Sequence, residues 1–182
     1  MFYLQQRKSK RGFTLVELLV SMAIFIVLVS VTLVNMRAGE TSKTLRYAAQ
    51  EFTSQLERMR NFSQTGATSG GMVPRGGYGI SFAYGSDATV SYTAFADKDP
   101  LVNKQMDSGE SLGVVYSLPR NMYFSSFTGM ASPAHIVFTP PYGDIWINGA
   151  QPVGNIELEL RAKGKSEIQK IIFNIQNHTI DY

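Results

Sequence analysis

Cysteine is absent from the 182-residue sequence. Its absence excludes disulfide bridges, thiolate nucleophiles and cysteine-ligated metal sites, and it leaves the redox compartment undetermined. A chain of this length has room for one domain with a sizeable core, or for one domain and an appendage. Such a domain must be held together by the packing of its core alone.

Charge is nearly absent from one long segment close to the N-terminus. Residues 13–34 are 22 consecutive positions with a single charged side chain, Glu17. At 1.5 Å per residue, a helix of this length extends about 33 Å, which is enough to cross the hydrocarbon core of a bilayer. The segment is predicted to be a transmembrane helix.

Acidic residues are absent from the first twelve positions, which carry four basic ones, Arg7, Lys8, Lys10 and Arg11. The whole chain has 17 basic and 14 acidic residues, with a net charge of +3. Without the first twelve positions, 13 basic residues face 14 acidic ones, which gives a side-chain net charge of −1. The basic character belongs to residues 1–12, so the net charge gives no support for nucleic-acid binding.

Three ordinary interpretations compete for the apolar segment. A secretory signal has a shorter apolar stretch, about 7–15 residues, and then a small-residue cleavage site, which is missing here. A plain membrane anchor fits the length, and its basic flank would stay on the cytoplasmic side. A buried core helix is the third, although the segment is long for one. None of them explains Glu17, since a charge inside an apolar span costs about 3 kcal/mol on insertion scales.

A cut between Gly12 and Phe13 would supply a partner for Glu17. It creates an α-amino group four residues before Glu17, which could pair with the carboxylate of the same chain or of a neighbour. The helix dipole also favours an anion near the helix N-terminus. A pair formed between subunits inside the membrane would both drive assembly and set its register.

The segment KRGFTLVELLV, Lys10–Val20, resembles the prepilin signature of type IV pilins and type II secretion pseudopilins. The resemblance implies that residues 1–12 are a leader cleaved after Gly12 by a prepilin peptidase, and that Phe13 is then N-methylated. It also implies that Glu17 neutralises the Phe13 amine of an adjacent subunit.

The same resemblance implies a location and a set of partners. The chain would be a single-pass protein of the cytoplasmic membrane with an extracytoplasmic C-terminal domain, and it would be assembled into a pilus or a pseudopilus. Its partners would be other pilin or pseudopilin subunits, the prepilin peptidase, the inner-membrane assembly platform and membrane lipid. Such subunits are structural, so no enzymatic activity is expected.

Residues 35–64 are expected to continue the helix as an amphipathic one. Apolar residues recur at spacings of three and four, and charged residues take the other faces. No proline lies near Val34, where major subunits of the family often carry one, and this favours a minor subunit. The stripe expected to pack on a sheet consists of Leu45, Ala48, Ala49, Phe52, Leu56 and Met59.

Residues 65–182 are predicted to form an extracytoplasmic, antiparallel β domain. Glycines and a proline mark a loop from Ser63 to Gly77, and short strand-like runs separated by turns come after it. The fold class is therefore α+β, a pilin-like fold in which a long N-terminal helix packs on a C-terminal antiparallel β-sheet domain. The predicted strands are 78–84, 89–96, 112–118, 122–127, 135–139, 144–147, 156–161 and 168–175.

Parts of this β domain are similar to pseudopilin-H-like minor pilins. Tyr92–Asp99 together with Asp107–Glu110 is similar to the acidic hairpin of that group, and the runs from Ile136 onward look like its C-terminal sheet. In that group the last strand leads to a glycine turn and a short final strand. This chain has Gln176–Thr179 in its place. The resemblance implies a minor structural subunit.

Oxygen-bearing side chains cluster between residues 97 and 110. Asp97, Asp99, Asp107 and Glu110 are the candidate ligands of a calcium ion, which prefers hard oxygen donors. Their spacing differs from that of an EF-hand loop, and the central glycine of such a loop is missing. A solvated hairpin turn is the favoured interpretation, and neither a metal nor another cofactor is predicted.

Basic residues cluster near one turn, and the candidates for nucleic-acid binding are Arg161, Lys163, Lys165 and Lys170. Glutamates are interspersed among them, so a solvated turn is favoured over a DNA-binding patch. The alternative function is nevertheless a tip-located module that binds DNA or an adhesion target. It differs from the filament-subunit hypothesis in predicting salt-sensitive binding to DNA.

Several motifs that suggest enzymes lack the context that the chemistry needs. Gly164-Lys165-Ser166 lacks the first glycine of a phosphate-binding loop. The glycine-rich run Arg75–Gly79 has neither a strand before it nor a helix after it, which argues against a dinucleotide site. Two separated histidines, His135 and His178, make no plausible metal or nucleophile site. A membrane-tethered enzyme is therefore the least supported of the three hypotheses.

Overall fold

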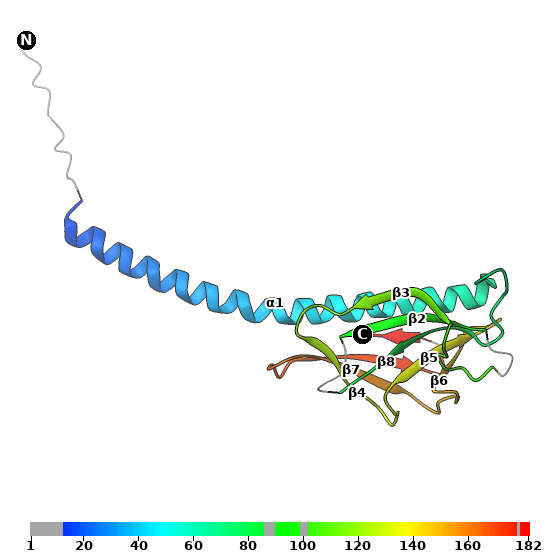
Figure 1. Cartoon of the computed structure of the whole chain (residues 1–182). Helices are drawn as coiled ribbons and strands as arrows, with labels where there is room; N and C mark the ends of the chain where they lie inside the picture. The colour runs from blue at the N-terminus through cyan, green and yellow to red at the C-terminus, as the bar shows by residue number, and fades with distance from the viewer. Residues whose placement is uncertain (1–12, 86–89, 99–101, 178) are drawn as a thin grey trace, which may run out of the picture. The chain divides into compact units, whose positions relative to one another are not determined.

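The computed structural model describes residues 13–85, 90–98, 102–177 and 179–182, without the side chains of residues 34–39. The chain divides into two compact units, Met1–Glu40 and Thr41–Tyr182. The second unit contains the later part of helix α1 and all the strands (Figure 1). The arrangement is α+β, as predicted, with an N-terminal helix and antiparallel sheets.

Helix α1 (Leu15–Thr65) is one continuous helix of 51 residues. It begins after Thr14, whose hydroxyl accepts a hydrogen bond from the Glu17 amide at 3.2 Å, as an N-cap residue does. It ends at Thr65, and the next residue, Gly66, has a φ of 63°. There the amide of Ala67 donates to the Phe62 carbonyl and that of Gly66 to the Ser63 carbonyl. This pair of bonds is a Schellman motif, which requires a residue with positive φ and therefore favours glycine.

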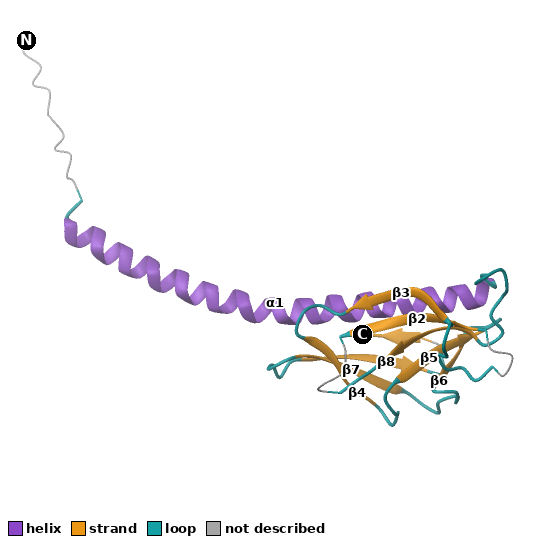
Figure 2. Ribbon diagram, in the orientation of Figure 1, coloured by secondary structure: helices purple, strands orange, loops and turns teal. Residues whose placement is uncertain are grey.

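Nine strands form two antiparallel sheets (Figure 2). The five-stranded sheet has the order β3-β2-β1-β5-β6, and the four-stranded sheet has the order β4-β7-β8-β9. The strand bounds are β1 (Gly77–Phe82), β2 (Ser91–Asp97), β3 (Ser111–Ser117), β4 (Met122–Phe127), β5 (Ala134–Thr139), β6 (Asp144–Ile147), β7 (Ile156–Ala162), β8 (Ile168–Asn174) and β9 (Thr179–Asp181).

All eight predicted strands are present, and most of their ends are shifted by one or two residues. The second predicted strand was expected to begin at Thr89, which lies outside the described residues. The sequence did not predict the division into two sheets. It also left the C-terminal end open, and there the chain turns into the short strand β9, which pairs with β8. The amide of Asn177 donates to the Asn174 side-chain oxygen at 3.2 Å, so an asparagine stabilises this turn without glycine.

The apolar stripe of α1 packs into the core shared by the two sheets. All six predicted positions, from Leu45 to Met59, are buried. At the centre, the Phe52 ring contacts Phe82 of β1 at 5.6 Å, Tyr92 of β2 at 5.0 Å and Phe124 of β4 at 4.9 Å between ring centroids. A single helix side chain thus joins both sheets, which explains why the helical period is so clear in this part of the sequence.

The glycine-rich run before β1 serves strand packing. At Gly77, where φ is 103°, a Cβ would lie 1.9 Å from the Phe138 carbonyl oxygen of β5. No side chain could be accommodated there while β1 and β5 stay paired. This close approach accounts for the glycine.

Ser63 connects the last turn of α1 to the five-stranded sheet. Its buried hydroxyl donates to the carbonyl of Phe138 in β5 and accepts from the amide of Tyr78 in β1 at 3.0 Å. Tyr78 and Phe138 are themselves partners in the β1–β5 ladder. One hydroxyl therefore satisfies two buried backbone groups at the end of this ladder.

Replacing Ser63 should destabilise the second unit. Ser63→Ala leaves a buried donor and a buried acceptor without their partner, which costs about 1–3 kcal/mol for each unsatisfied group. Chemical denaturation of the full chain in detergent, followed by the fluorescence of Trp146, measures the change. Ser54→Ala on the exposed face of the same helix is the control and should change the unfolding free energy by less than about 0.5 kcal/mol. Equal stability of the two variants would contradict this role for Ser63.

Candidate assembly site on the apolar helix

The first part of α1 presents an apolar surface with no cover from the rest of the described chain. Leu15–Leu33 is long and apolar enough to span a membrane, and none of it is buried. Leaving so many large apolar side chains in water would be strongly unfavourable, at roughly 25 cal/mol per Å². Either lipid or other apolar helices must therefore surround this segment.

Glu17 is the one charged residue of this surface, and it lies in the first turn of α1. Its amide is held by the Thr14 hydroxyl, so the backbone that carries the carboxylate is fixed at the helix N-terminus. No basic side chain forms an ion pair with Glu17 among the residues that the structure describes. The site therefore offers an exposed carboxyl group at the start of an apolar helix.

The hydroxyl groups of the apolar segment are satisfied within the helix. Ser21 donates to the Glu17 carbonyl at 2.7 Å, Ser30 to the Ile26 carbonyl at 2.7 Å, and Thr32 to the Leu28 carbonyl at 2.6 Å. A hydroxyl that bonds to the carbonyl four residues earlier leaves no free donor for an apolar environment to penalise. Glu17 is thus the polar group of Leu15–Leu33 that still requires an external partner.

The predicted processing residues lie at the edge of the described chain. Phe13 has 83% of its surface exposed and precedes the helix by two residues. Gly12 and the basic leader residues Arg7, Lys8, Lys10 and Arg11 lie outside the described residues. Their roles in cleavage and orientation remain predictions.

The acidic turn does not have the predicted solvated character at two of its carboxylates. Asp97 and Glu110 are buried. The Asp97 carboxylate accepts the amide of Lys104 at 2.8 Å, and the Glu110 carboxylate accepts the amides of Lys98 at 2.8 Å and Asp107 at 2.9 Å. The prediction was wrong because a turn with unpaired backbone amides can hold a buried carboxylate by hydrogen bonding it.

These bonds occupy the candidate calcium ligands. Asp107 accepts the side-chain amide of Asn103 at 2.6 Å, and Asp99 lies outside the described residues. No group of three or more histidine or acidic side chains suited to a metal ion occurs within the ranges that the structure describes. The carboxylates of Asp97, Asp107 and Glu110 thus stabilise the turn by accepting hydrogen bonds within it.

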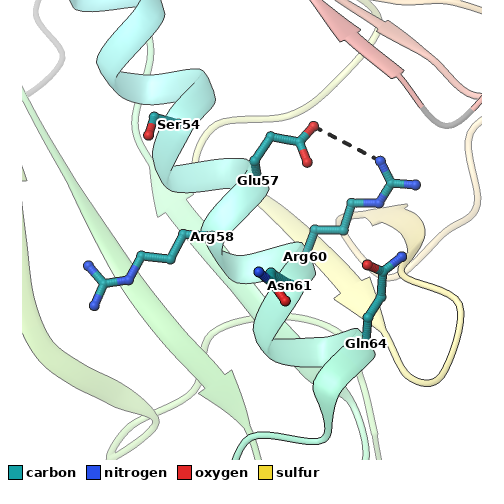
Figure 3. A pocket seen from close by; sticks show the side chains of 6 residues that line it. All are labelled: Ser54, Glu57, Arg58, Arg60, Asn61 and Gln64. Atoms are coloured by element: carbon teal, nitrogen blue, oxygen red, sulfur yellow. Dashed lines mark ion pairs between the residues drawn. The ribbon is translucent and has the colours of Figure 1, made fainter.

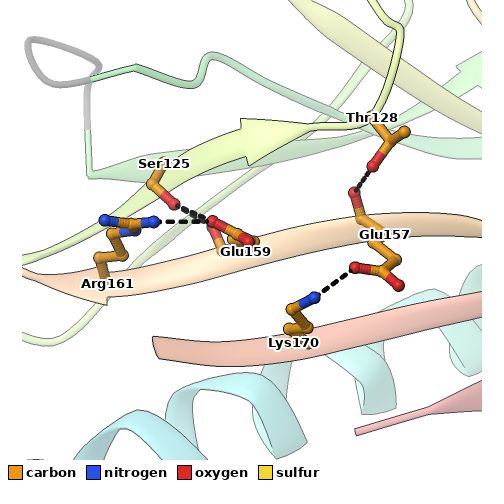
Figure 4. Close-up of polar contacts among 6 residues, drawn as sticks. All are labelled: Ser125, Thr128, Glu157, Glu159, Arg161 and Lys170. Carbon is orange, nitrogen blue, oxygen red and sulfur yellow. Dashed lines mark hydrogen bonds and ion pairs between the residues drawn. The ribbon is translucent and has the colours of Figure 1, made fainter. Parts of the chain in front are cut away.

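The basic cluster is partly neutralised by strand neighbours (Figure 4). Arg161 pairs with Glu159 at 3.2 Å, and Lys170 pairs with Glu157 at 2.7 Å across β7 and β8. Burial opposes ionisation of Glu159, but the hydrogen bond from Arg161 and the positive charges of Arg161 and Lys170 hold its pKa below the usual value. Lys163 and Lys165 remain as exposed cations at the turn. Two of the four basic residues predicted to bind nucleic acid are therefore already paired with glutamates.

A polar hollow that the sequence did not predict lies on the outer face of α1 (Figure 3). It has a volume of about 550 Å³. Glu57 lies 4.0 Å from Arg60, and the Gln64 amide donates to the Tyr142 carbonyl at 2.9 Å, while Arg58 points to the other side. The Gln64 bond holds the β5–β6 turn against the helix, whereas the Glu57–Arg60 pair lies within the helix. The lining residues are Ser54, Glu57, Arg58, Arg60, Asn61 and Gln64.

His135 joins the acidic turn to β5. Its Nδ1 atom accepts the amide of Met106 at 3.4 Å, and its ring meets the Phe95 ring edge-on at 6.1 Å. Burial lowers the pKa of His135, although Asp107 nearby opposes the shift. The neutral ring is therefore the form that fits the folded turn, since an imidazolium could not accept this bond.

Comparison with known families finds one match, at the N-terminus. The family described as the prokaryotic N-terminal methylation motif matches residues 7–33, which include the basic residues from Arg7 to Arg11, Glu17 and the apolar helix Leu15–Leu33. No curated protein and no solved structure matches the chain significantly. The match supports the class of type IV pilin-like or pseudopilin subunits, which are structural proteins, and it indicates anchoring to the membrane through one helix.

His135 should make the second unit less stable in mild acid. Because its folded pKa is lowered, the unfolded chain binds the proton first, so the unfolding free energy falls as the pH drops through about 6.5. Thermal unfolding of the full chain in detergent between pH 7.5 and pH 5.5 measures this loss. His135→Gln should reduce the pH dependence in this range, whereas His178→Gln, at the other histidine, should retain it. The same pH dependence in wild type and His135→Gln would contradict the assignment.

Proposed function

We propose that this chain is a minor structural subunit of a type IV pilus or a type II secretion pseudopilus. A prepilin peptidase removes residues 1–12, Phe13 is N-methylated, and the mature chain stays in the cytoplasmic membrane until it is assembled. Residues 13–34 are the transmembrane and assembly helix, residues 35–64 the amphipathic helix, and residues 65–182 the extracytoplasmic domain. The observation that carries the proposal is the exposed apolar helix with a single acid, Glu17, in its first turn.

The energetic role of Glu17 follows from its surroundings. A carboxylate inside an apolar span costs about 3 kcal/mol by insertion scales. The helix N-terminus recovers about 0.3–1 kcal/mol of that cost through its dipole. A cationic amine at Phe13 of a neighbouring subunit supplies the remaining compensation, and the carboxylate in turn stabilises that amine.

This ion pair favours the transfer of the helix from lipid into the assembly, a step that changes the free energy of the apolar side chains little. The apolar side chains of Leu15–Leu33 gain little when they move from lipid to a bundle of similar helices, because lipid tails are equally apolar. Polar pairing and the inner-membrane assembly platform must therefore determine when a subunit enters the filament. A subunit without its acid keeps the membrane anchor and loses the signal for assembly.

The minor role has support from the helix itself. Major subunits of this class often carry a helix-kinking proline near the position of Val34, and α1 here continues without a break from Leu15 to Thr65. A proline in the helix interior removes a hydrogen bond and kinks the helix. The absence of this feature favours a specialised position in the assembly, such as initiation or the tip.

DNA binding at the tip has weaker support. Two of the four candidate cations, Arg161 and Lys170, are engaged by glutamates. Phosphate contacts contribute to affinity through the number of cations that are free to replace counterions. Lys163 and Lys165 alone would give a weak, salt-sensitive interaction.

Glu17→Ala should separate assembly from insertion. The variant is expected to reach the membrane in wild-type amounts, because removing a charge favours insertion, and to be lost from sheared surface filaments or pseudopili. Immunoblots of the membrane and filament fractions measure both. Glu51→Ala, an exposed acid on the later part of α1, is the control and should assemble normally. Wild-type incorporation of Glu17→Ala would contradict the proposal.

Processing should be visible in the mass of the mature chain. Mass spectrometry of the membrane-extracted protein is expected to find Phe13 at the N-terminus with one added methyl group. Gly12→Leu should retain the leader, since the peptidase would no longer find the small residue before the cut. A mature N-terminus at any other residue would contradict the assignment.

A further inference from the structure

Another hollow lies in the second unit, between the loop that follows α1 and the residue that follows β2. Its volume is about 230 Å³. Three of the described residues that line it are apolar and two are basic, and none of them is acidic. The lining residues, which we call the loop hollow, are Met72, Val73, Pro74, Arg75 and Lys98.

The loop wall of the hollow is a hydrogen-bonded turn. The amide of Ser69 donates to the Met72 carbonyl at 2.8 Å, and the amide of Met72 donates back to the Ser69 carbonyl at 3.5 Å. The Lys98 side chain lies against this turn, since a Cβ on Gly70 would be 3.7 Å from its Nζ atom. A ligand therefore meets walls that are already formed, which reduces the entropy lost on binding.

The two basic side chains of the loop hollow are not neutralised by the described part of the chain. The ion pairs found there include neither Arg75 nor Lys98. The buried carboxylate of Asp97 lies against Gly76, where a Cβ would be 1.9 Å from it, and accepts the amide of Lys104. Two positive charges that border one hollow repel each other, so an anion bound between them is stabilised by both.

The volume of the loop hollow, about 230 Å³, suits a single amino-acid residue. Pockets for drug-sized ligands are larger, at about 300–1,000 Å³. A C-terminal residue carries its carboxylate and its side chain on the same Cα atom, so one residue can contact both the cations and the apolar wall. An internal aspartate or glutamate beside an apolar residue needs room for two residues. The hollow therefore fits a C-terminal residue better than an internal acid.

We propose that the loop hollow binds the C-terminal residue of another protein, an apolar residue whose free carboxylate pairs with Arg75 and Lys98. The guanidinium of Arg75 can hold both carboxylate oxygens, and Lys98 adds a second positive charge. The side chain of the bound residue packs on Met72 and Val73, which are both exposed in the free chain. Methionine adapts to apolar groups of different shape, so leucine, valine and phenylalanine ends are all accepted.

Fluorescence anisotropy with the full chain in detergent tests the proposal. The probe is a fluorescein-labelled pentapeptide, four serine and glycine residues followed by a leucine with a free carboxylate. Saturable binding is expected, and added salt should weaken it because the two cations are near the surface. The same peptide with a C-terminal amide should bind at least about tenfold more weakly, because it loses the charge-assisted bonds.

Substitutions in the full chain assign the binding to the loop hollow. Arg75→Gln combined with Lys98→Gln should weaken the free-carboxylate peptide at least about tenfold. Lys163→Gln combined with Lys165→Gln is the matched control, because it removes two exposed cations at a different turn, and it should bind as wild type does. Thermal unfolding of both double variants should match wild type, since the exchanged side chains form no ion pair in the described chain.

Several results would overturn the proposal. They are no saturable binding at millimolar peptide, equal binding of the amidated peptide, and wild-type binding by the Arg75→Gln, Lys98→Gln variant. Tighter binding of an amidated peptide with an internal glutamate would assign the carboxylate to a side chain instead. Tighter binding of a short oligothymidine that depends on the same two cations would assign them to nucleic acid. None of these results bears on the assembly of Glu17→Ala, so the proposed function is tested separately.

Discussion

The apolar helix is governed by one physical constraint, the free-energy cost of keeping a carboxylate in apolar surroundings without a positive partner. Glu17 lies in the first turn of a segment that has no other charge and no cover from the rest of the described chain. The hydroxyls beside it satisfy themselves along the helix, so they do not compete for the role. Glu17 therefore makes the free energy of this segment differ between lipid and a bundle of subunit helices. Lipid offers no positive charge to pair with the carboxylate, whereas the N-terminal amine of a neighbouring subunit does.

In the second unit, the later part of α1 is stabilised by packing and not by a charged pair. Here the helix is held by burial, since Phe52 joins the two sheets and Ser63 closes the β1–β5 ladder. The acidic turn is held by hydrogen bonds from backbone amides to Asp97 and Glu110. One helix thus combines an unpartnered apolar segment with a segment whose apolar stripe is buried in the core, and that combination suits a subunit that carries a folded domain into an assembly.

The helix and most strands could be predicted from the sequence, because apolar residues recur there with a regular helical or strand spacing. The helical stripe from Leu45 to Met59 and the alternating strand Ile156–Ala162 are clear because each residue's environment follows from its spacing. The division into two sheets could not be predicted, since it depends on pairings such as β1 with β5 that are remote in the chain. Strand β9 is too short to show a period. Asp97 and Glu110 were expected in solvent because no sequence pattern reveals which amides a turn will leave free.

The most direct test is a distance measurement between the two members of the proposed ion pair. Assemblies are prepared in which the mature chain is labelled with ¹³C at the Glu17 carboxylate and the neighbouring subunits are labelled with ¹⁵N at their N-terminal residue. Solid-state NMR then measures the dipolar coupling between the labels. We expect a coupling between subunits that corresponds to a separation of about 4 Å or less, the range of a salt bridge. No coupling in the mixed assemblies, or coupling only when both labels are on the same chain, would contradict it.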